Sequence, residues 1–109
     1  MATPQGRPER FLVYSTAGSQ RDLVRDAREQ PHWDEHAAFI DGLVVEGFIQ
    51  LGGPLDEEGG GFLVVMAQNE DEARERLQHD PWYAHAILSL VWVKRWRIFI
   101  DTWEATSGA

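Results

Sequence analysis

The chain's densest group of chemically active side chains is the segment 32–36, which reads HWDEH. Two histidines four residues apart share one face of a helix, where they could hold a metal ion with Glu35 as a base. A metalloprotease of this type needs a third ligand on another helix and a much larger fold, and His32 comes directly after Pro31. We therefore expect no metal and no cofactor, with a simpler divalent-metal site on these histidines as the alternative.

His36 by itself can act as a general acid or base, because an imidazole takes up and releases a proton near neutral pH. On a helical wheel it falls between Phe39 and Ile40, on the apolar face. It can therefore be a catalytic group or a core histidine that a backbone carbonyl satisfies. Asp80 also has a structural interpretation, because it directly precedes Pro81 and is a natural N-cap for a helix that begins there.

The other residues that could take part in chemistry have structural interpretations that we favour. His79 and His85 are expected at the surface or at the rim of a pocket. The segment 59–61 is three glycines without a strand before them and a helix after them, so it predicts a hairpin connection and not a phosphate loop. Three late tryptophans are expected in the core or in a dimer contact: Trp92, Trp96 and Trp103.

Composition narrows the function classes. The chain has 109 residues, enough for one domain, and its 18 acidic and 10 basic residues give a net charge of −8, which excludes a typical nucleic-acid binder. The absence of cysteine excludes thiolate nucleophiles, disulfides and Cys-ligated metals. The apolar run 88–93 is far shorter than the roughly 20 residues of a membrane span, and the first residues lack the apolar stretch of a secretion signal. We expect a cytoplasmic protein without a membrane partner.

Hydrophobic periodicity and turn residues predict the secondary structure. The expected strands are 10–16, 48–51, 62–67 and 88–101, and the expected main helices are 32–46 and 69–78. Ser19 and Asp22 resemble a capping box, so a short helix is expected before Pro31, which suits the first turn of the next helix. Residues 1–9 are expected to form a loose arm, 10–103 one domain and 104–109 a tail.

This order of elements predicts an α+β fold of the ferredoxin-like βαββαβ type with an antiparallel sheet. Strands 62–66 and 88–93 are apolar at both odd and even positions, so both faces of the sheet need cover. Two helices can cover one face only. We therefore expect a second copy of the chain on the other face, in a homodimer.

With these features the chain resembles the YCII-related family of small dimeric α+β-barrel proteins, from about Phe11 to Ile100. The resemblance rests on His36 at the start of the first main helix, Glu46-Gly47 at its end, Gly53-Pro54 after the second strand and Asp80-Pro81 after the second helix. The chain departs from the family at Trp82, where a tyrosine is usual and Tyr83 follows. It also departs over Gln20–Gln30, which is longer and more charged.

The resemblance implies that His36 and Asp80 form an active-site pair, whose side chains should approach within about 2.6–3.2 Å. The same cleft should hold these substrate-binding residues: Tyr14 or Ser15, Gly53 with room beside it, Pro54, Trp82 and Tyr83. Because related barrels carry out isomerisation, elimination or oxygenation on hydroxylated rings, we expect a cofactor-independent, lyase- or isomerase-like enzyme for a hydroxylated cyclic or aromatic metabolite. The alternative is a non-catalytic ligand-binding or accessory module, in which the pair is a structural hydrogen bond.

Overall fold

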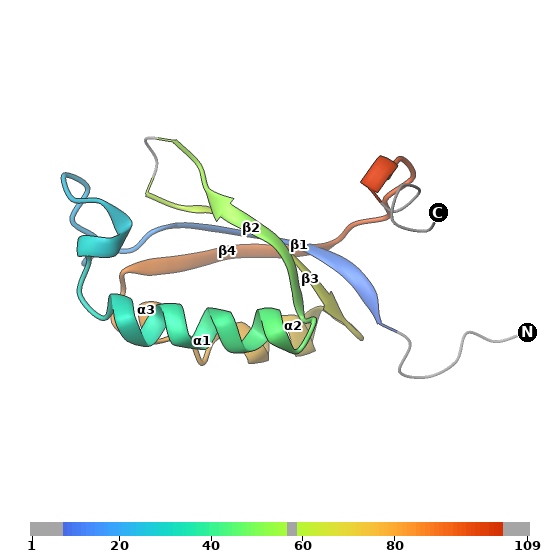
Figure 1. Cartoon of the computed structure of the whole chain (residues 1–109), viewed down its shortest axis with the longest axis horizontal. Helices are drawn as coiled ribbons and strands as arrows, with labels where there is room; N and C mark the ends of the chain where they lie inside the picture. The colour runs from blue at the N-terminus through green and yellow to red at the C-terminus, as the bar shows by residue number, and fades with distance from the viewer. Residues whose placement is uncertain (1–7, 57–58, 104–109) are drawn as a thin grey trace, which may run out of the picture.

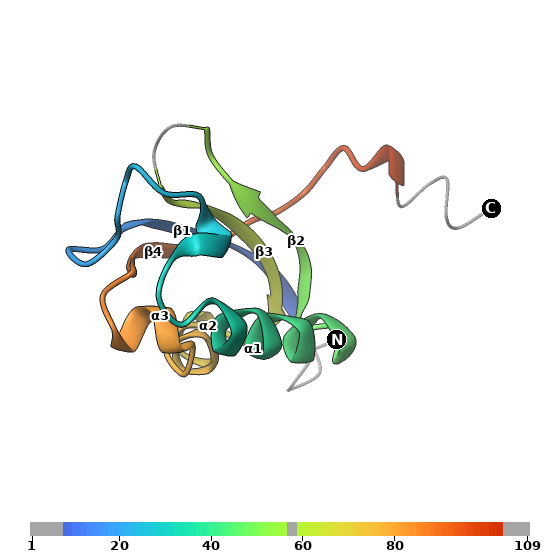
Figure 2. The same cartoon turned by 60° about the vertical axis from the view of Figure 1, so that its left-hand side comes forward.

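The predicted βαββαβ fold is confirmed by the computed structural model, which describes residues 8–56 and 59–103. Four antiparallel strands form one sheet in the order β2-β3-β1-β4, and the helices lie together on one side of it (Figures 1 and 2). Most of the expected N-terminal arm and the whole expected tail 104–109 lie outside the described residues. Within the described residues, no helix is long and apolar enough to cross a membrane.

The elements follow the predicted order, with one short helix added between α2 and β4. The strands are β1 (Glu9–Ala17), β2 (Ile49–Pro54), β3 (Gly61–Ala67) and β4 (Leu88–Arg95). The helices are α1 (Trp33–Val45), α2 (Glu70–Leu77) and α3 (Pro81–Ala84), with a 3-10 turn, η1 (Ala27–Glu29). Asn69 caps α2 by accepting a hydrogen bond from the backbone N–H of Glu72 at 2.8 Å, as the sequence predicts.

Side chains of the sheet alternate between two different environments. On β1, Phe11 and Val13 point toward the helices and are buried in the core, with Leu43, Val65 and Leu77. The rings of Tyr14, Phe62 and Trp92 form a cluster, with centroids 5.1–6.0 Å apart, on the face that the helices leave uncovered. The sheet therefore has an apolar surface on both sides.

The helix expected between Ser19 and Pro31 does not form. Leu23 and Val24 are exposed by 71% and 95%, so the weak apolar stripe has nothing to pack against. A loop replaces the helix, because the buried amide of Gln30 donates hydrogen bonds to the carbonyls of Asp22, Arg25 and Asp26 and accepts one from the N–H of Asp22. The capping box of this segment begins at Asp26, with Glu29 as its partner, and starts only η1.

Pro31 lies outside α1 and not in its first turn. His32 is the N-cap and has a left-handed backbone (φ 63°), so the chain changes direction there before α1 begins at Trp33. The preceding carbonyl, that of Pro31, accepts a hydrogen bond from the indole of Trp82 at 2.9 Å. This tertiary contact accounts for a boundary that local helix signals place too early.

Two strand boundaries also differ from the prediction. β2 continues through the glycines to Pro54, because its antiparallel partner β3 already begins at Gly61, which pairs with Pro54. β4 ends at Arg95, which pairs with Phe11, and not at Asp101; β1 starts at Glu9, so it has too few residues left to pair with a strand that reaches Asp101. The last bond of this ladder runs from the N–H of Trp96 to the carbonyl of Arg10, at 2.9 Å.

α3 is tied to β1 by a hydrogen bond between the hydroxyls of Tyr83 and Ser15, 2.5 Å apart. Burial raises the pKa of Tyr83 above its ordinary value of 10.0, the bond to Ser15 opposes this rise, and the charge of Asp80 adds to it. The phenol is therefore held in its neutral, hydrogen-bonded form.

We expect stability to fall at alkaline pH because of Tyr83. In the unfolded chain this phenol loses its proton near pH 10.0, whereas the folded protein keeps it to higher pH. Deprotonation therefore stabilises the unfolded state relative to the folded state as pH rises above 10.0. Urea unfolding at several pH values between about 8 and 11 should show a falling free energy of unfolding, with a shallower fall in Tyr83→Phe. Identical slopes in the two proteins would contradict this assignment.

Candidate functional site

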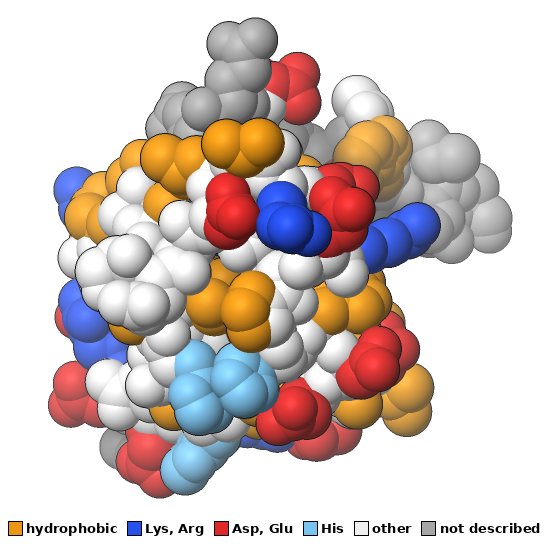
Figure 3. Space-filling model, turned by 90° about the vertical axis from the view of Figure 1, so that its left-hand side faces the viewer, with side chains coloured by type: hydrophobic (Ala, Val, Ile, Leu, Met, Phe, Trp, Pro, Cys, Tyr) orange, Lys and Arg blue, Asp and Glu red, His pale blue; other side chains and the backbone are white. Residues whose placement is uncertain are grey.

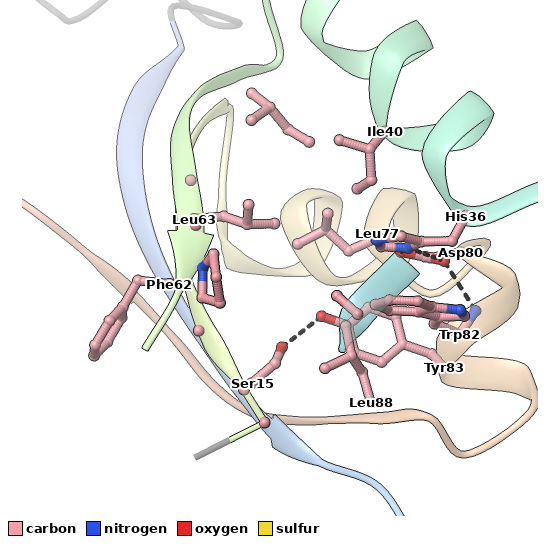
Figure 4. Close-up of a pocket in the computed structure, with 18 of the residues that line it drawn as sticks. Ser15, His36, Ile40, Phe62, Leu63, Leu77, Asp80, Trp82, Tyr83 and Leu88 are labelled. Carbon is pink, nitrogen blue, oxygen red and sulfur yellow. Dashed lines mark hydrogen bonds and ion pairs between the residues drawn. The ribbon is translucent and has the colours of Figure 1, made fainter. Parts of the chain in front are cut away.

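The side chains of His36 and Asp80, 44 positions apart in the sequence, form a direct hydrogen-bonded pair (Figure 4). His36 Nδ1 lies 2.7 Å from one carboxylate oxygen of Asp80 and 2.9 Å from the other. These distances lie within the range expected from the family resemblance. The carboxylate is 2% exposed and the imidazole 13%, so the pair is shielded from bulk water.

Local structure holds each member of this pair in place. Asp80 is the N-cap of α3, as its position before Pro81 predicts, and its Oδ1 accepts a hydrogen bond from the backbone N–H of Trp82 at 2.9 Å. His36 lies in the first turn of α1, and its N–H donates to the carbonyl of His32 at 3.0 Å. The two helix starts therefore face each other across the pair.

The geometry also determines which imidazole nitrogen is available. An ionised carboxylate can only accept hydrogen bonds, so the hydrogen of the neutral ring is on Nδ1, facing Asp80. Nε2 then carries the lone pair, and none of the described residues forms a hydrogen bond to it. Chemically, His36 is a base whose tautomer is set by Asp80.

Trp82 holds the imidazole ring from one side. The rings of His36 and Trp82 stack with centroids 3.7 Å apart and an interplanar angle of 4°, and Trp33 lies 5.7 Å from each of them. The indole N–H of Trp82 is anchored on the carbonyl of Pro31. Trp82, where the resemblance leads us to expect a tyrosine, is therefore the residue on which the imidazole stacks.

His36 and Asp80 open into a cavity of about 390 Å³, a size typical of small-molecule sites. Its wall is mainly apolar, and the polar groups gather at the end near α3 (Figure 4). The apolar wall includes Trp33, Ile40, Leu63, Leu77 and Leu88. The polar lining residues at the α3 end are His36, Asp80, Ser15, Tyr83 and Arg21, and Gln50 lines the cavity from β2. A mainly apolar cavity with a few polar groups at one end can accommodate a flat ring that carries hydroxyls.

The glycines of β2 form part of this wall, with Gly53 and Pro54 among the lining residues. A Cβ atom on Gly53 would meet nothing within 4 Å, but Gly53 pairs with Phe62, whose side chain points away from the cavity. On Gly52 a Cβ would lie 2.3 Å from Leu63 Cδ2. Gly53 therefore lines the cavity wall with open space beside it, as expected, and Gly52 is the position where a side chain would collide with Leu63.

The structure brings most of the expected site residues together, with one exception. Ser15, Trp82 and Tyr83 line the cavity with His36 and Asp80. Tyr14 points to the opposite face of the sheet, where it contacts Phe62 and Trp92, because neighbouring residues of a strand alternate in direction. Of the two hydroxyls expected on β1, that of Ser15 is the one in the cavity.

The other histidines lie outside the cavity. Histidine side chains gather on the end of the molecule seen in Figure 3. The rings of His32 and His85 stack, with centroids 3.8 Å apart. His79 is exposed. Over 8–56 and 59–103, no group of three or more His, Cys, Asp or Glu side chains is arranged to hold a metal ion.

Among the lining residues that the sequence analysis missed, Trp33 and Arg21 have the clearest functional potential. Trp33 lies inside the HWDEH segment, but its neighbours carried the chemical signal. Arg21 belongs to the charged segment Gln20–Gln30, and only the tertiary fold shows that this loop reaches the cavity. The high charge of this segment was the available signal.

Known proteins resemble this chain in both sequence and structure. No curated protein matches it. Among solved structures, it is similar to 5-chloro-2-hydroxyhydroquinone dehydrochlorinase from Burkholderia phenoliruptrix in complex with 2,5-dihydroxybenzoquinone, with a TM-score of 0.60 and 26% identity, covering 81% of this chain and 93% of that one. Residues 10–97 match the YCII-related domain. Because this match spans most of the sequence, the chain belongs to the YCII-related family.

Proposed function

We propose that the protein is a cofactor-independent, lyase- or isomerase-like enzyme for a hydroxylated cyclic compound, with His36 as its general acid and base. The observation that carries the proposal is a buried carboxylate–imidazole pair that opens into a ring-sized apolar cavity. The similar dehydrochlorinase, whose structure contains 2,5-dihydroxybenzoquinone, supports the substrate class. Its activity is a property of that protein, which we extend to this chain as a proposal.

The reaction begins with a proton transfer from a ring hydroxyl to Nε2 of His36. The O–H electron pair becomes the second bond of a carbonyl, and a ring double bond shifts its electrons to a neighbouring carbon. That carbon then takes the proton back from the imidazolium, which completes an isomerisation. Asp80 keeps Nδ1 protonated and stabilises the imidazolium formed between the two transfers.

Elimination extends the same sequence by one step. If the protonated carbon carries a leaving group, loss of a second hydroxyl proton to His36 forms another carbonyl. The leaving group then departs with its bonding electrons. The net change is loss of one proton and one anion from the ring, so no electrons are exchanged with the protein.

Five residues position the substrate in this proposal. The hydroxyls of Ser15 and Tyr83 offer hydrogen bonds to ring oxygens, and the indole of Trp82 fixes the imidazole plane. Gly53 and Pro54 form the facing wall on β2. Because Tyr83 stays neutral well into the alkaline range, it can donate to a developing oxyanion.

Removing either member of the pair should abolish most of the activity. In a screen of hydroxylated chloro-aromatic rings, including 5-chloro-2-hydroxyhydroquinone, we expect His36→Ala and Asp80→Asn each to lower chloride release or quinone formation at least about 100-fold. The amide introduced by Asp80→Asn could still cap α3 through its oxygen, so this variant separates tautomer control from folding. His79→Ala, at an exposed histidine outside the cavity, is the matched control. Unchanged turnover in both test variants would contradict the roles of His36 and Asp80, whereas ligand binding without any turnover in the wild type would favour the non-catalytic binding module.

We also propose that two copies pair through the uncovered face of the sheet, which carries the aromatic cluster of Tyr14, Phe62 and Trp92. Sedimentation equilibrium at micromolar concentration should then give twice the chain mass of 12.4 kDa. Trp92→Glu should shift the protein toward monomer, because it places a charge in this apolar surface. Val24→Glu, at a side chain 95% exposed on the loop before η1, should not. A stable wild-type monomer would contradict the proposed dimer.

A further inference from the structure

The cavity contains a cation that the acid–base mechanism does not use, the guanidinium of Arg21. This residue follows β1 in a loop that is tied to the α3–β4 connection by two backbone bonds, from Gly18 to Ile87 at 2.9 Å and from Gln20 to Ala86 at 2.8 Å. Gly59, just before β3, lies beside its stem, because a Cβ added to Gly59 would be 3.8 Å from Arg21 Cγ. The loop that carries Arg21 is therefore fixed to the α3–β4 connection at the cavity wall.

The guanidinium of Arg21 is left with hydrogen-bonding capacity. Its Nε is fully buried and has no hydrogen-bond partner among residues 8–56 and 59–103, although a buried donor without an acceptor costs free energy. It also has no ion-pair partner in the part of the chain that the structure describes. Four other arginines there do pair with carboxylates: Arg25 with Asp22, Arg74 with Glu70, Arg76 with Glu46 and Arg95 with Glu9.

Arg21 contacts the same indole as the reacting histidine. Its guanidinium carbon is 5.9 Å from the ring centroid of Trp82, and the ring of His36 stacks on that indole at 3.7 Å. One indole thus connects the cation and the base. A cation–π contact alone leaves the charge of the guanidinium without a counter-charge, whereas a bound anionic oxygen in the cavity would supply one.

We propose that Arg21 is a substrate-binding residue that selects cyclic ligands with an ionised ring oxygen, a phenolate or an enolate. The inference rests on the proposed function, because it specifies the substrate class of that same cavity. Proton removal by His36 places further negative charge on the ring, and a fixed guanidinium stabilises that charge as it develops. Arg21 therefore favours ring hydroxyls that are acidic enough to be ionised when the ligand enters.

The test is a comparison of two ligands that differ in charge. 2,5-Dihydroxybenzoquinone is anionic at neutral pH, because each hydroxyl is conjugated with a carbonyl, whereas hydroquinone is a neutral ring with two hydroxyls. Quenching of tryptophan fluorescence reports binding of both, since Trp33 and Trp82 line the cavity. The wild-type protein should bind the anion more tightly than the neutral ring.

Arg21→Met should weaken binding of the anion at least about tenfold and leave binding of hydroquinone within about twofold. Arg21→Lys keeps the charge but loses the planar fork, so its effect on the anion should be intermediate. Equal effects on the two ligands, no effect of Arg21→Met on the anion, or no preference of the wild type for the anion would overturn the proposal. Thermal unfolding of each variant identifies any loss that comes from misfolding, and Arg21→Lys retains the comparison if Arg21→Met misfolds.

This result is separable from the proposed mechanism, because it measures binding and not turnover. Loss of anion selectivity in Arg21→Met together with full turnover in His36→Ala would support the anion site and contradict the acid–base role of His36. Unchanged selectivity in Arg21→Met together with lost turnover in His36→Ala would contradict the anion site and support the acid–base mechanism.

Discussion

The rest of the site depends on one buried carboxylate, that of Asp80. A charge that is 2% exposed is stable only if it is paired and hydrogen-bonded, and Asp80 receives the N–H of Trp82 and the Nδ1 of His36. These bonds join the start of α3 to the first turn of α1. Removing one partner of such a buried pair typically costs about 3–5 kcal/mol, because the other is left uncompensated. The same interaction therefore stabilises the contact between two helices and sets the tautomer of His36.

The sheet separates the two surfaces on which the account depends. On β1, Ser15 faces the cavity and Tyr14 faces the aromatic cluster on the uncovered side, although the two residues are adjacent. The proposed catalytic and dimer surfaces are thus built from alternate positions of the same strands. A substitution on the dimer face can therefore be tested for its effect on activity without changing a side chain of the cavity, and the reverse also holds.

The sequence predicted the elements whose signals are local. Strand patterns, the Asn69 cap and the Asp80-Pro81 helix start are all encoded within a few residues, and the structure contains each of them. The His36–Asp80 contact joins residues 44 positions apart, so no spacing rule could predict it, and the expectation came from resemblance to a family. The domain limits and the cellular compartment stay predictions.

The errors have a common physical cause, which is a partner distant in sequence. The loop at Gln20–Gln30 forms because the amide of Gln30 satisfies three backbone carbonyls, and β4 ends where β1 no longer offers a neighbour. Arg21 was missed for the same reason, since its loop reaches the cavity only in the folded protein. Local helix and strand propensities cannot predict any of these contacts.

The central claim is that His36 presents an unprotonated Nε2 to a ligand in the cavity while Asp80 holds the hydrogen on Nδ1. Nitrogen-15 NMR of the imidazole near neutral pH, with the signals assigned through His36→Gln, measures this directly. The account predicts the Nδ1–H tautomer in the free protein and a shift of the Nε2 resonance when 2,5-dihydroxybenzoquinone is added. A hydrogen on Nε2 of the free protein, or a ring that does not respond to the bound ligand, would contradict it.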